Sequence, residues 1–136
     1  MTAEAHRILL VDDDVDFVEM NRRILEARGY CVEGAYNAQE ALVRMPAFRP
    51  HLVITDLMMQ TLDAGFSLAR RVKEDPQLRN VRVIIVTSVT SSMGLDFRPR
   101  TAEDLAAMHA DAYFDKPVAP QLLLAKVQEL LAERPA

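Results

Sequence analysis

Acidic residues follow the first apolar run of the chain. The run ILLV, residues 8–11, leads directly into Asp12, Asp13 and Asp14. Carboxylates crowded together repel one another, and the pKa of at least one rises unless a cation joins them. The sequence therefore predicts a cation-binding site at the end of this run.

Three further groups with useful chemistry stand at the ends of later apolar runs. They are the carboxylate of Asp56, the hydroxyl of Thr87 and the ammonium of Lys116. If the runs are parallel strands of one sheet, their carboxyl ends share one edge, and ligands of open α/β sheets bind at that edge. We therefore expect these groups to meet the first acidic cluster.

A local role explains some of these polar residues. Asp, Ser and Thr favour helix starts and turns because their side chains bond to nearby backbone groups. For Asp14 and Asp16 we expect this role, at the start of the first helix. Thr87 taken alone fits either a local or a functional role. Asp12, Asp13 and Asp56 are expected to converge with Lys116, and this convergence favours a functional role over a local one.

The ligand types narrow the choice of cation. Oxygen ligands without histidine or cysteine suit Mg2+, Mn2+ or Ca2+. Asp12, Asp14 and Asp16 have the D-x-D-x-D spacing of a calcium loop, but that loop needs glycine at its sixth place and glutamate at its twelfth. The sequence has Phe17 and Arg23 there. We therefore expect Mg2+, with Mn2+ as the alternative.

The apolar runs have the length of strands, and segments with helical character separate them. Runs that are apolar throughout, instead of alternating, are typical of parallel strands covered on both faces. The pattern predicts an α/β fold with a five-stranded parallel sheet flanked by five helices. The expected strands lie near residues 7–11, 30–34, 51–55, 82–87 and 112–114.

The helical segments carry start signals and apolar stripes. Asn37 with Glu40, and Thr101 with Asp104, resemble capping boxes, and Pro120 suits a first helical turn. The last helix is expected to bury one apolar stripe, formed by Leu122, Leu123, Val127, Leu130 and Leu131. In the first helix, residues 15–28, the expected buried side is Phe17, Ile24 and Leu25.

Composition sets the broad class of the protein. The 136 residues suit a single domain, residues 1–136, and 16 basic against 20 acidic residues give a formal charge of -4. The scattered arginines predict no direct nucleic-acid binding. No segment reaches the roughly 20 apolar residues of a membrane span. We expect a cytoplasmic protein with a buried Cys31, and His6, His51 and His109 apart from one another.

Four motifs, in order, resemble one known family. VDDD, VITD, IIVTS and YFDKPV are similar to the motifs of the response-regulator receiver domain of bacterial two-component signalling, including chemotaxis regulators. The resemblance covers almost the whole chain. It implies a flavodoxin-like doubly wound (βα)5 fold. It also implies a protein that catalyses only its own phosphoryl transfer and dephosphorylation.

The resemblance implies a role for each residue at the strand ends. Asp56 is the implied phosphoacceptor, and Asp12, Asp13 and Asp56 are the implied metal ligands. The backbone carbonyl of Met58 would complete that ligand set. The same resemblance gives Lys116 first the Asp56 carboxylate and then a phosphoryl oxygen as its partner.

Further implied roles concern switching. Thr87 would also stabilise the phosphoryl group, and movement of Thr87 would let Tyr113 change position and alter a partner-binding face. The bond between Lys116 and Pro117 is expected to be cis.

The implied partners are proteins. A histidine kinase or phosphotransfer protein would donate the phosphoryl group, and a downstream protein or a tethered output domain would respond. The resemblance is also compatible with a dimer that forms on phosphorylation.

The chain departs from the family pattern in two places. The usual D-x-x-M-P-x-M-D-G reads DLMMQTLDAG here, with Gln60 in place of proline and Ala64 as an extra residue. Residues 88–100 form an insertion, which we interpret as a surface loop, with docking through Phe97 as the alternative. In the family, the residues two places beyond the acceptor and two places beyond the switch hydroxyl border the path of hydrolytic water. Here they are the apolar Met58 and Val89, so the resemblance implies slow dephosphorylation.

Two other functions fit part of the pattern. A haloacid-dehalogenase-like phosphohydrolase would use Asp12 and Asp14 as its D-x-D, but it leaves Asp56 unexplained. Its later acidic pair would have to come from Glu129 and Glu133, on an amphipathic helix. A pseudo-receiver, which keeps the fold and is never phosphorylated, is the other alternative.

Overall fold

The fold places five strands in one parallel sheet. The computed structural model describes residues 6–56, 64–78, 80–87 and 101–132. In chain order the strands are β1 (Arg7–Val11), β2 (Cys31–Ala35), β3 (Leu52–Thr55), β4 (Arg82–Thr87) and β5 (Ala112–Asp115). Their order in the sheet is β2-β1-β3-β4-β5, with every neighbouring pair parallel. The predicted α/β class and strand positions are confirmed to within one residue.

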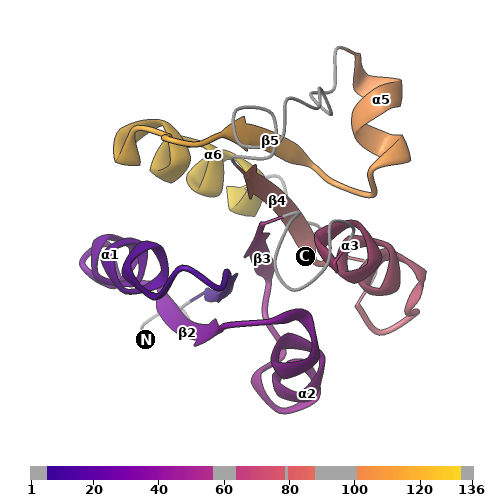
Figure 1. Cartoon of the computed structure of the whole chain (residues 1–136), viewed down its shortest axis with the longest axis horizontal. Coiled ribbons are helices and arrows are strands. Elements are labelled where there is room, and N and C mark those ends of the chain that lie inside the picture. Colours follow the sequence, from indigo (N-terminus) through magenta and orange to yellow (C-terminus); the bar gives the residue numbers. More distant parts are fainter. Residues whose placement is uncertain (1–5, 57–63, 79, 88–100, 133–136) are drawn as a thin grey trace.

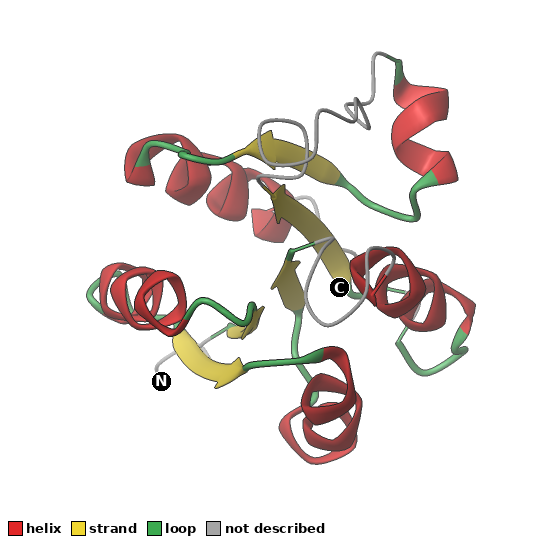
Figure 2. Ribbon diagram, in the orientation of Figure 1, coloured by secondary structure: helices red, strands yellow, loops and turns green. Residues whose placement is uncertain are grey.

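Helices cover both faces of this sheet. They are α1 (Val15–Glu26), α2 (Ala38–Phe48), α3 (Ala64–Glu74), α5 (Ala102–Ala107) and α6 (Pro120–Ala132). The strands lie between the helices in the ribbon views (Figures 1 and 2). Among the described residues, no helix is both long enough and apolar enough to cross a membrane.

The apolar strand residues divide between two cores. Leu9, Val53 and Ile85 pack on the face that α2 and α3 cover. Ile8, Ile54 and other alternate residues pack against α1 and α6 on the opposite face. Because successive strand side chains point to opposite faces, a strand buried on both sides must be apolar throughout. This explains the unbroken runs in the sequence.

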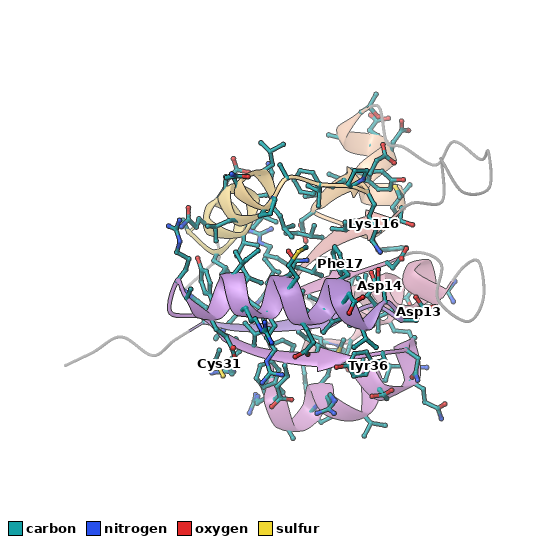
Figure 3. All side chains as sticks on the ribbon, turned by 60° about the vertical axis from the view of Figure 1, so that its left-hand side comes forward. Asp13, Asp14, Phe17, Cys31, Tyr36 and Lys116 are labelled. Carbon is teal, nitrogen blue, oxygen red and sulfur yellow. The ribbon has the colours of Figure 1, made fainter. Side chains whose placement is uncertain are left out.

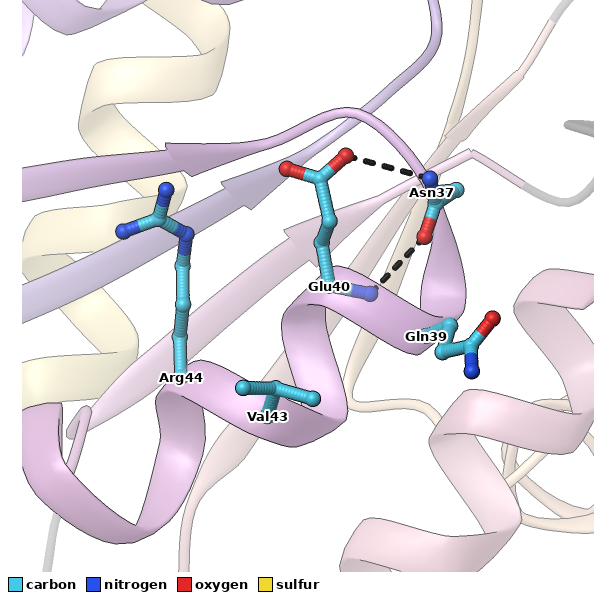
Figure 4. A pocket seen from close by; sticks show the side chains of 5 residues that line it. All are labelled: Asn37, Gln39, Glu40, Val43 and Arg44. Atoms are coloured by element: carbon cyan, nitrogen blue, oxygen red, sulfur yellow. Dashed lines mark hydrogen bonds between the residues drawn. The ribbon is translucent and has the colours of Figure 1, made fainter.

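The predicted helix starts are present. Asn37 Oδ1 accepts the Glu40 backbone N–H at 2.8 Å, and the Asn37 amide donates to Glu40 Oε2 at 3.1 Å (Figure 4). Thr101 Oγ1 accepts the Asp104 N–H at 3.0 Å, and Pro120 is the first residue of α6. These caps satisfy helix N–H groups that have no partner within the helix.

The sheet's strand order explains two wrong expectations. Cys31 is exposed, because it begins the edge strand β2. His6 and His51 are not apart, since their ring centroids lie 5.2 Å from each other. They directly precede β1 and β3, which are neighbours in the sheet.

The apolar stripes of two helices also differ from the expectation. Leu122 is 60% exposed, and Leu124 is buried in its place on α6. On α1 the buried positions are Val18, Asn21 and Leu25, whereas Phe17 and Ile24 are only partly buried. In both helices the packing selects a stripe rotated slightly from the predicted one.

A close approach between β2 and α1 gives a test of the packing. A Cβ added at Gly34 would lie 2.8 Å from Cγ1 of the fully buried Val18. We predict that Gly34→Ala lowers the free energy of unfolding by about 1–3 kcal/mol, because a stiff β-branched side chain must move in a packed core.

Urea denaturation of both single variants and the double variant measures this effect. In a Val18→Ala background, Gly34→Ala should cost clearly less, because the opposing methyl group is gone. Equal costs in the two backgrounds would contradict the predicted contact.

Candidate functional site

The strand register brings the expected carboxylates together. Val11 of β1 pairs with Thr55 of β3, so both strands end at the same level. The Asp56 backbone N–H continues this ladder by donating to the Val11 carbonyl at 3.1 Å. One carboxylate oxygen from each of Asp12, Asp13 and Asp56 lies within 4.8 Å of the others. Asp12 and Asp56 are buried, whereas Asp13 is exposed.

Lys116 joins two of these carboxylates from the far end of the chain. Its Nζ donates to Asp12 Oδ2 at 2.7 Å and to Asp56 Oδ2 at 3.2 Å. Its backbone N–H donates to the Thr87 carbonyl at 2.8 Å, which fixes it beside the end of β4. The ammonium therefore bridges two acids: the expected pairing with Asp56 is present, and Asp12 is a second partner. The expected cis bond between Lys116 and Pro117 is confirmed.

The first acidic residue also has a backbone partner. Asp12 Oδ1 accepts the Asp14 N–H at 2.9 Å, so both of its oxygens take part in hydrogen bonds. Asp14 in turn caps α1, because its Oδ1 accepts the N–H groups of Asp16 and Phe17. The capping role expected for Asp14 is confirmed. This cap holds the acidic loop against the start of α1.

Burial shapes the electrostatics of the site. It raises the pKa of Asp12 from 3.8 to about 6, although the hydrogen bonds from Lys116 and Asp14 and the charge of Lys116 act in the opposite direction. For Lys116, burial lowers the pKa, but the hydrogen bond and charge of Asp12 and the charge of Asp56 outweigh it and raise the pKa. The Lys116 ammonium thus stays charged, while the pKa of Asp12, about 6, lies close to neutral pH.

Thr87 and Tyr113 lie on one face of the sheet. Thr87 is fully buried and pairs with Asp115, while Tyr113 pairs with Ile85 two positions earlier. Residues two apart on a strand point to the same face. The partly buried Tyr113 ring packs against the core beneath α2 and α3, and its hydroxyl donates to Asp115 Oδ1 at 3.4 Å. The two expected switch residues therefore share a face and neighbouring strands.

One residue of the site was missed by sequence reasoning. The Nζ of Lys116 lies 4.4 Å from the ring centroid of Phe17, in the first turn of α1. Figure 3 shows Asp13, Asp14, Phe17 and Lys116 at the same end of the molecule, with Cys31 at the other end. An aromatic residue one turn after the acidic loop was the available signal, but an apolar stripe explained it equally well.

Several expected features fall outside the described residues. These are the Met58 carbonyl, the Val89 side chain and the inserted segment 88–100 with Phe97. The rest of the expected site is described, and it converges at one edge of the sheet.

Comparison with known families gives one match over most of the chain. Residues 8–128 match the family described as "Response regulator receiver domain". The solved structure of a CheY-like response regulator receiver domain protein from Methanospirillum hungatei is 30% identical, with a TM-score of 0.80. That similarity covers 96% of this chain and 97% of the other. Chemotaxis response regulator CheY4 of Vibrio cholerae is 25% identical, with a TM-score of 0.78, over 93% of this chain and 99% of that protein.

Curated relatives are longer than this chain. Response regulator MprA of Mycolicibacterium vanbaalenii is 35% identical over 92% of this chain, which corresponds to 50% of that protein. Response regulator PleD of Caulobacter vibrioides is 33% identical over 91% of this chain and 26% of its own length. The chain thus spans half or less of the length of these relatives.

The raised pKa of Asp12 leads to a prediction about stability. A folded-state pKa of about 6 against 3.8 means that the folded protein holds the Asp12 proton more tightly. This contribution is fully present below pH 3.8 and is lost as pH rises through 6. In metal-free buffer at pH 7, Asp12→Asn should therefore be more stable than the wild type, by about 1–3 kcal/mol.

Urea denaturation with a chelator present, at a series of pH values, measures this difference. The advantage of Asp12→Asn should shrink as pH falls from 7 toward 4, and Asp16→Asn, an exposed acid on α1, provides the control. A variant less stable than wild type at pH 7 would show that the burial penalty at Asp12 is absent.

Proposed function

The chain belongs to the response regulator receiver domain family, and we propose that Asp56 is the residue that accepts its phosphoryl group. Receiver domains pair with histidine kinases and catalyse only their own phosphoryl transfer. The observation that carries the proposal is the bridging position of Lys116 between Asp12 and Asp56, beside a cluster of three carboxylates.

The proposed reaction transfers one phosphoryl group. A carboxylate oxygen of Asp56 forms the new bond to phosphorus as the bond to the donor breaks, and the donor leaves with the electron pair. The donor is a phosphohistidine of a kinase or phosphotransfer protein, or a small acyl phosphate. Catalysis of such transfers consists mainly of positioning and of neutralising charge.

The carboxylates fit a divalent cation. Asp12, Asp13 and Asp56 supply oxygen ligands only, and this donor set suits Mg2+, or Mn2+ as the alternative. When bound, the ion would neutralise charge on the phosphoryl oxygens. Both Asp12 oxygens already accept hydrogen bonds, which favours contact through water for this residue. The Met58 carbonyl is the further ligand that we propose from the family motif.

Lys116 and Thr87 would stabilise the transferred group. The Lys116 ammonium, now 3.2 Å from Asp56 Oδ2, would pair with a phosphoryl oxygen once Asp56 is modified. Thr87 ends β4 in a buried position on the same edge, and its hydroxyl would donate to another phosphoryl oxygen. An inward shift of Thr87 would then change the space open to Tyr113.

The proposed output is a change in the surface around α5, β5 and α6. A downstream protein or a tethered output domain would recognise this surface, and dimerisation on phosphorylation is compatible with the same face. We propose a cytoplasmic location, where histidine kinases present their phosphohistidine.

The structure disfavours the phosphohydrolase alternative. That function needs the Asp14 side chain as the second acid of a D-x-D pair, whereas Asp14 Oδ1 accepts two backbone N–H groups as the cap of α1. The family match also includes Asp56, which the phosphohydrolase leaves without a role.

Phosphorylation by acetyl phosphate tests the proposed acceptor. With Mg2+ present, intact-mass measurement should show one labile phosphate-sized addition to the wild type and none to Asp56→Asn. Asp16→Asn, a carboxylate-to-amide change in the first turn of α1, should be modified like the wild type. Absence of the addition in the wild type with acetyl phosphate and with a phosphorylated kinase would favour the pseudo-receiver.

The lifetime of the modified protein gives a second test. Met58 and Val89 are apolar, and we propose that they hinder the attack of water on the phosphorylated Asp56. Replacing both with polar residues, as Met58→Asn and Val89→Thr, should shorten the lifetime several-fold after the donor is removed. The measurement is loss of the phosphate mass with time. An unchanged lifetime would remove the proposed role of these side chains.

A further inference from the structure

The ring of Phe17 closes one side of the Lys116 site. Nζ lies 4.4 Å from the ring centroid, while it donates to Asp12 Oδ2 at 2.7 Å and to Asp56 Oδ2 at 3.2 Å. The Lys116 side chain is only 17% exposed. An ammonium group has three hydrogen-bond donors and no acceptor. Two of these donors go to the Asp12 and Asp56 carboxylates, and the Phe17 ring is a third neighbour of the same cation.

Two contacts fix the ring in this place. The Phe17 backbone N–H donates to the capping Asp14 at 3.2 Å, which sets the first turn of α1. The ring also packs against the core that lies beneath α1 and α6. A backbone hydrogen bond and the packing of the ring therefore both fix the position of Phe17. The face of an aromatic ring carries partial negative charge and attracts a cation at this distance.

We propose that Phe17 is a positioning residue that keeps the Lys116 ammonium at the Asp12 and Asp56 carboxylates during phosphoryl transfer. This inference rests on the proposed function of the site. Lys116 is closer to Asp12 than to Asp56, and a cation bound to the same carboxylates would weaken both pairs by repulsion and competition. The ring attracts the ammonium without depending on those carboxylates. The Phe17 ring therefore holds Lys116 within reach of a phosphoryl oxygen when a bound cation shares the Asp12 and Asp56 carboxylates.

Variants that separate ring chemistry from packing test the proposal. Phe17→Leu keeps an apolar side chain without a ring, and Phe17→Tyr keeps the ring. Val18→Ala is the matched control, because Val18 is buried in the same core but its Cγ1 points to Gly34. At saturating Mg2+, Phe17→Leu should phosphorylate with acetyl phosphate about 5- to 20-fold more slowly than wild type. Phe17→Tyr and Val18→Ala should stay near the wild-type rate.

A second readout follows Lys116 without any reaction. With 15N-labelled lysine in metal-free protein, the Lys116 NH3+ signal, identified by its loss in Lys116→Met, reports hydrogen exchange with water. Phe17→Leu should speed this exchange several-fold, and Phe17→Tyr should restore it.

The outcomes distinguish the two proposals. Unchanged exchange and unchanged rate in Phe17→Leu, or equal losses in Phe17→Leu, Phe17→Tyr and Val18→Ala, would overturn the positioning role. If the wild type takes no phosphate, the function assigned to Asp56 fails, and the exchange measurement still decides whether Phe17 holds Lys116.

Discussion

The structure depends on one constraint, namely that carboxylates buried at the carboxyl ends of the strands need a cation. Asp12 and Asp56 end neighbouring strands and are both buried, and Lys116 donates to each of them. Lys116 is 104 positions from Asp12 and 60 from Asp56. The interaction therefore joins the end of the chain to its start. Removing the Lys116 ammonium would leave the two buried carboxylates without this shared cationic partner.

The parallel sheet makes this arrangement available. Carboxyl ends of β1, β3, β4 and β5 meet on one edge, and the two helical layers bury the strands that carry them. The caps at the start of α1 then shape the site itself. Asp14 positions both the acidic loop and Phe17, because its backbone donates to Asp12 while its side chain binds the first turn of the helix. A local capping rule thus contributes directly to the proposed chemistry.

The sequence predicts which residues meet at the site better than it predicts the side-chain contacts among them. The meeting of Asp12, Asp56 and Lys116 could be predicted, because strand ends in a parallel sheet converge whatever the side chains do. The shorter bond from Lys116 to Asp12, and the contact with Phe17, depend on the rotation of α1 and on side-chain geometry that periodicity does not define. The exposure of Cys31 depends on which strand lies at the sheet edge, a property of the strand order alone.

The measurement that tests this account most directly is the pH titration of the Asp12 carboxyl carbon by 13C NMR in the metal-free protein. The account predicts a midpoint near 6, caused by burial and only partly offset by Lys116. It also predicts a higher midpoint in Lys116→Met, because the ammonium opposes the effect of burial. A midpoint at 3.8 in the wild type, unchanged in Lys116→Met, would mean that the Asp12 carboxylate lies in water and away from the ammonium. That result would contradict the buried site.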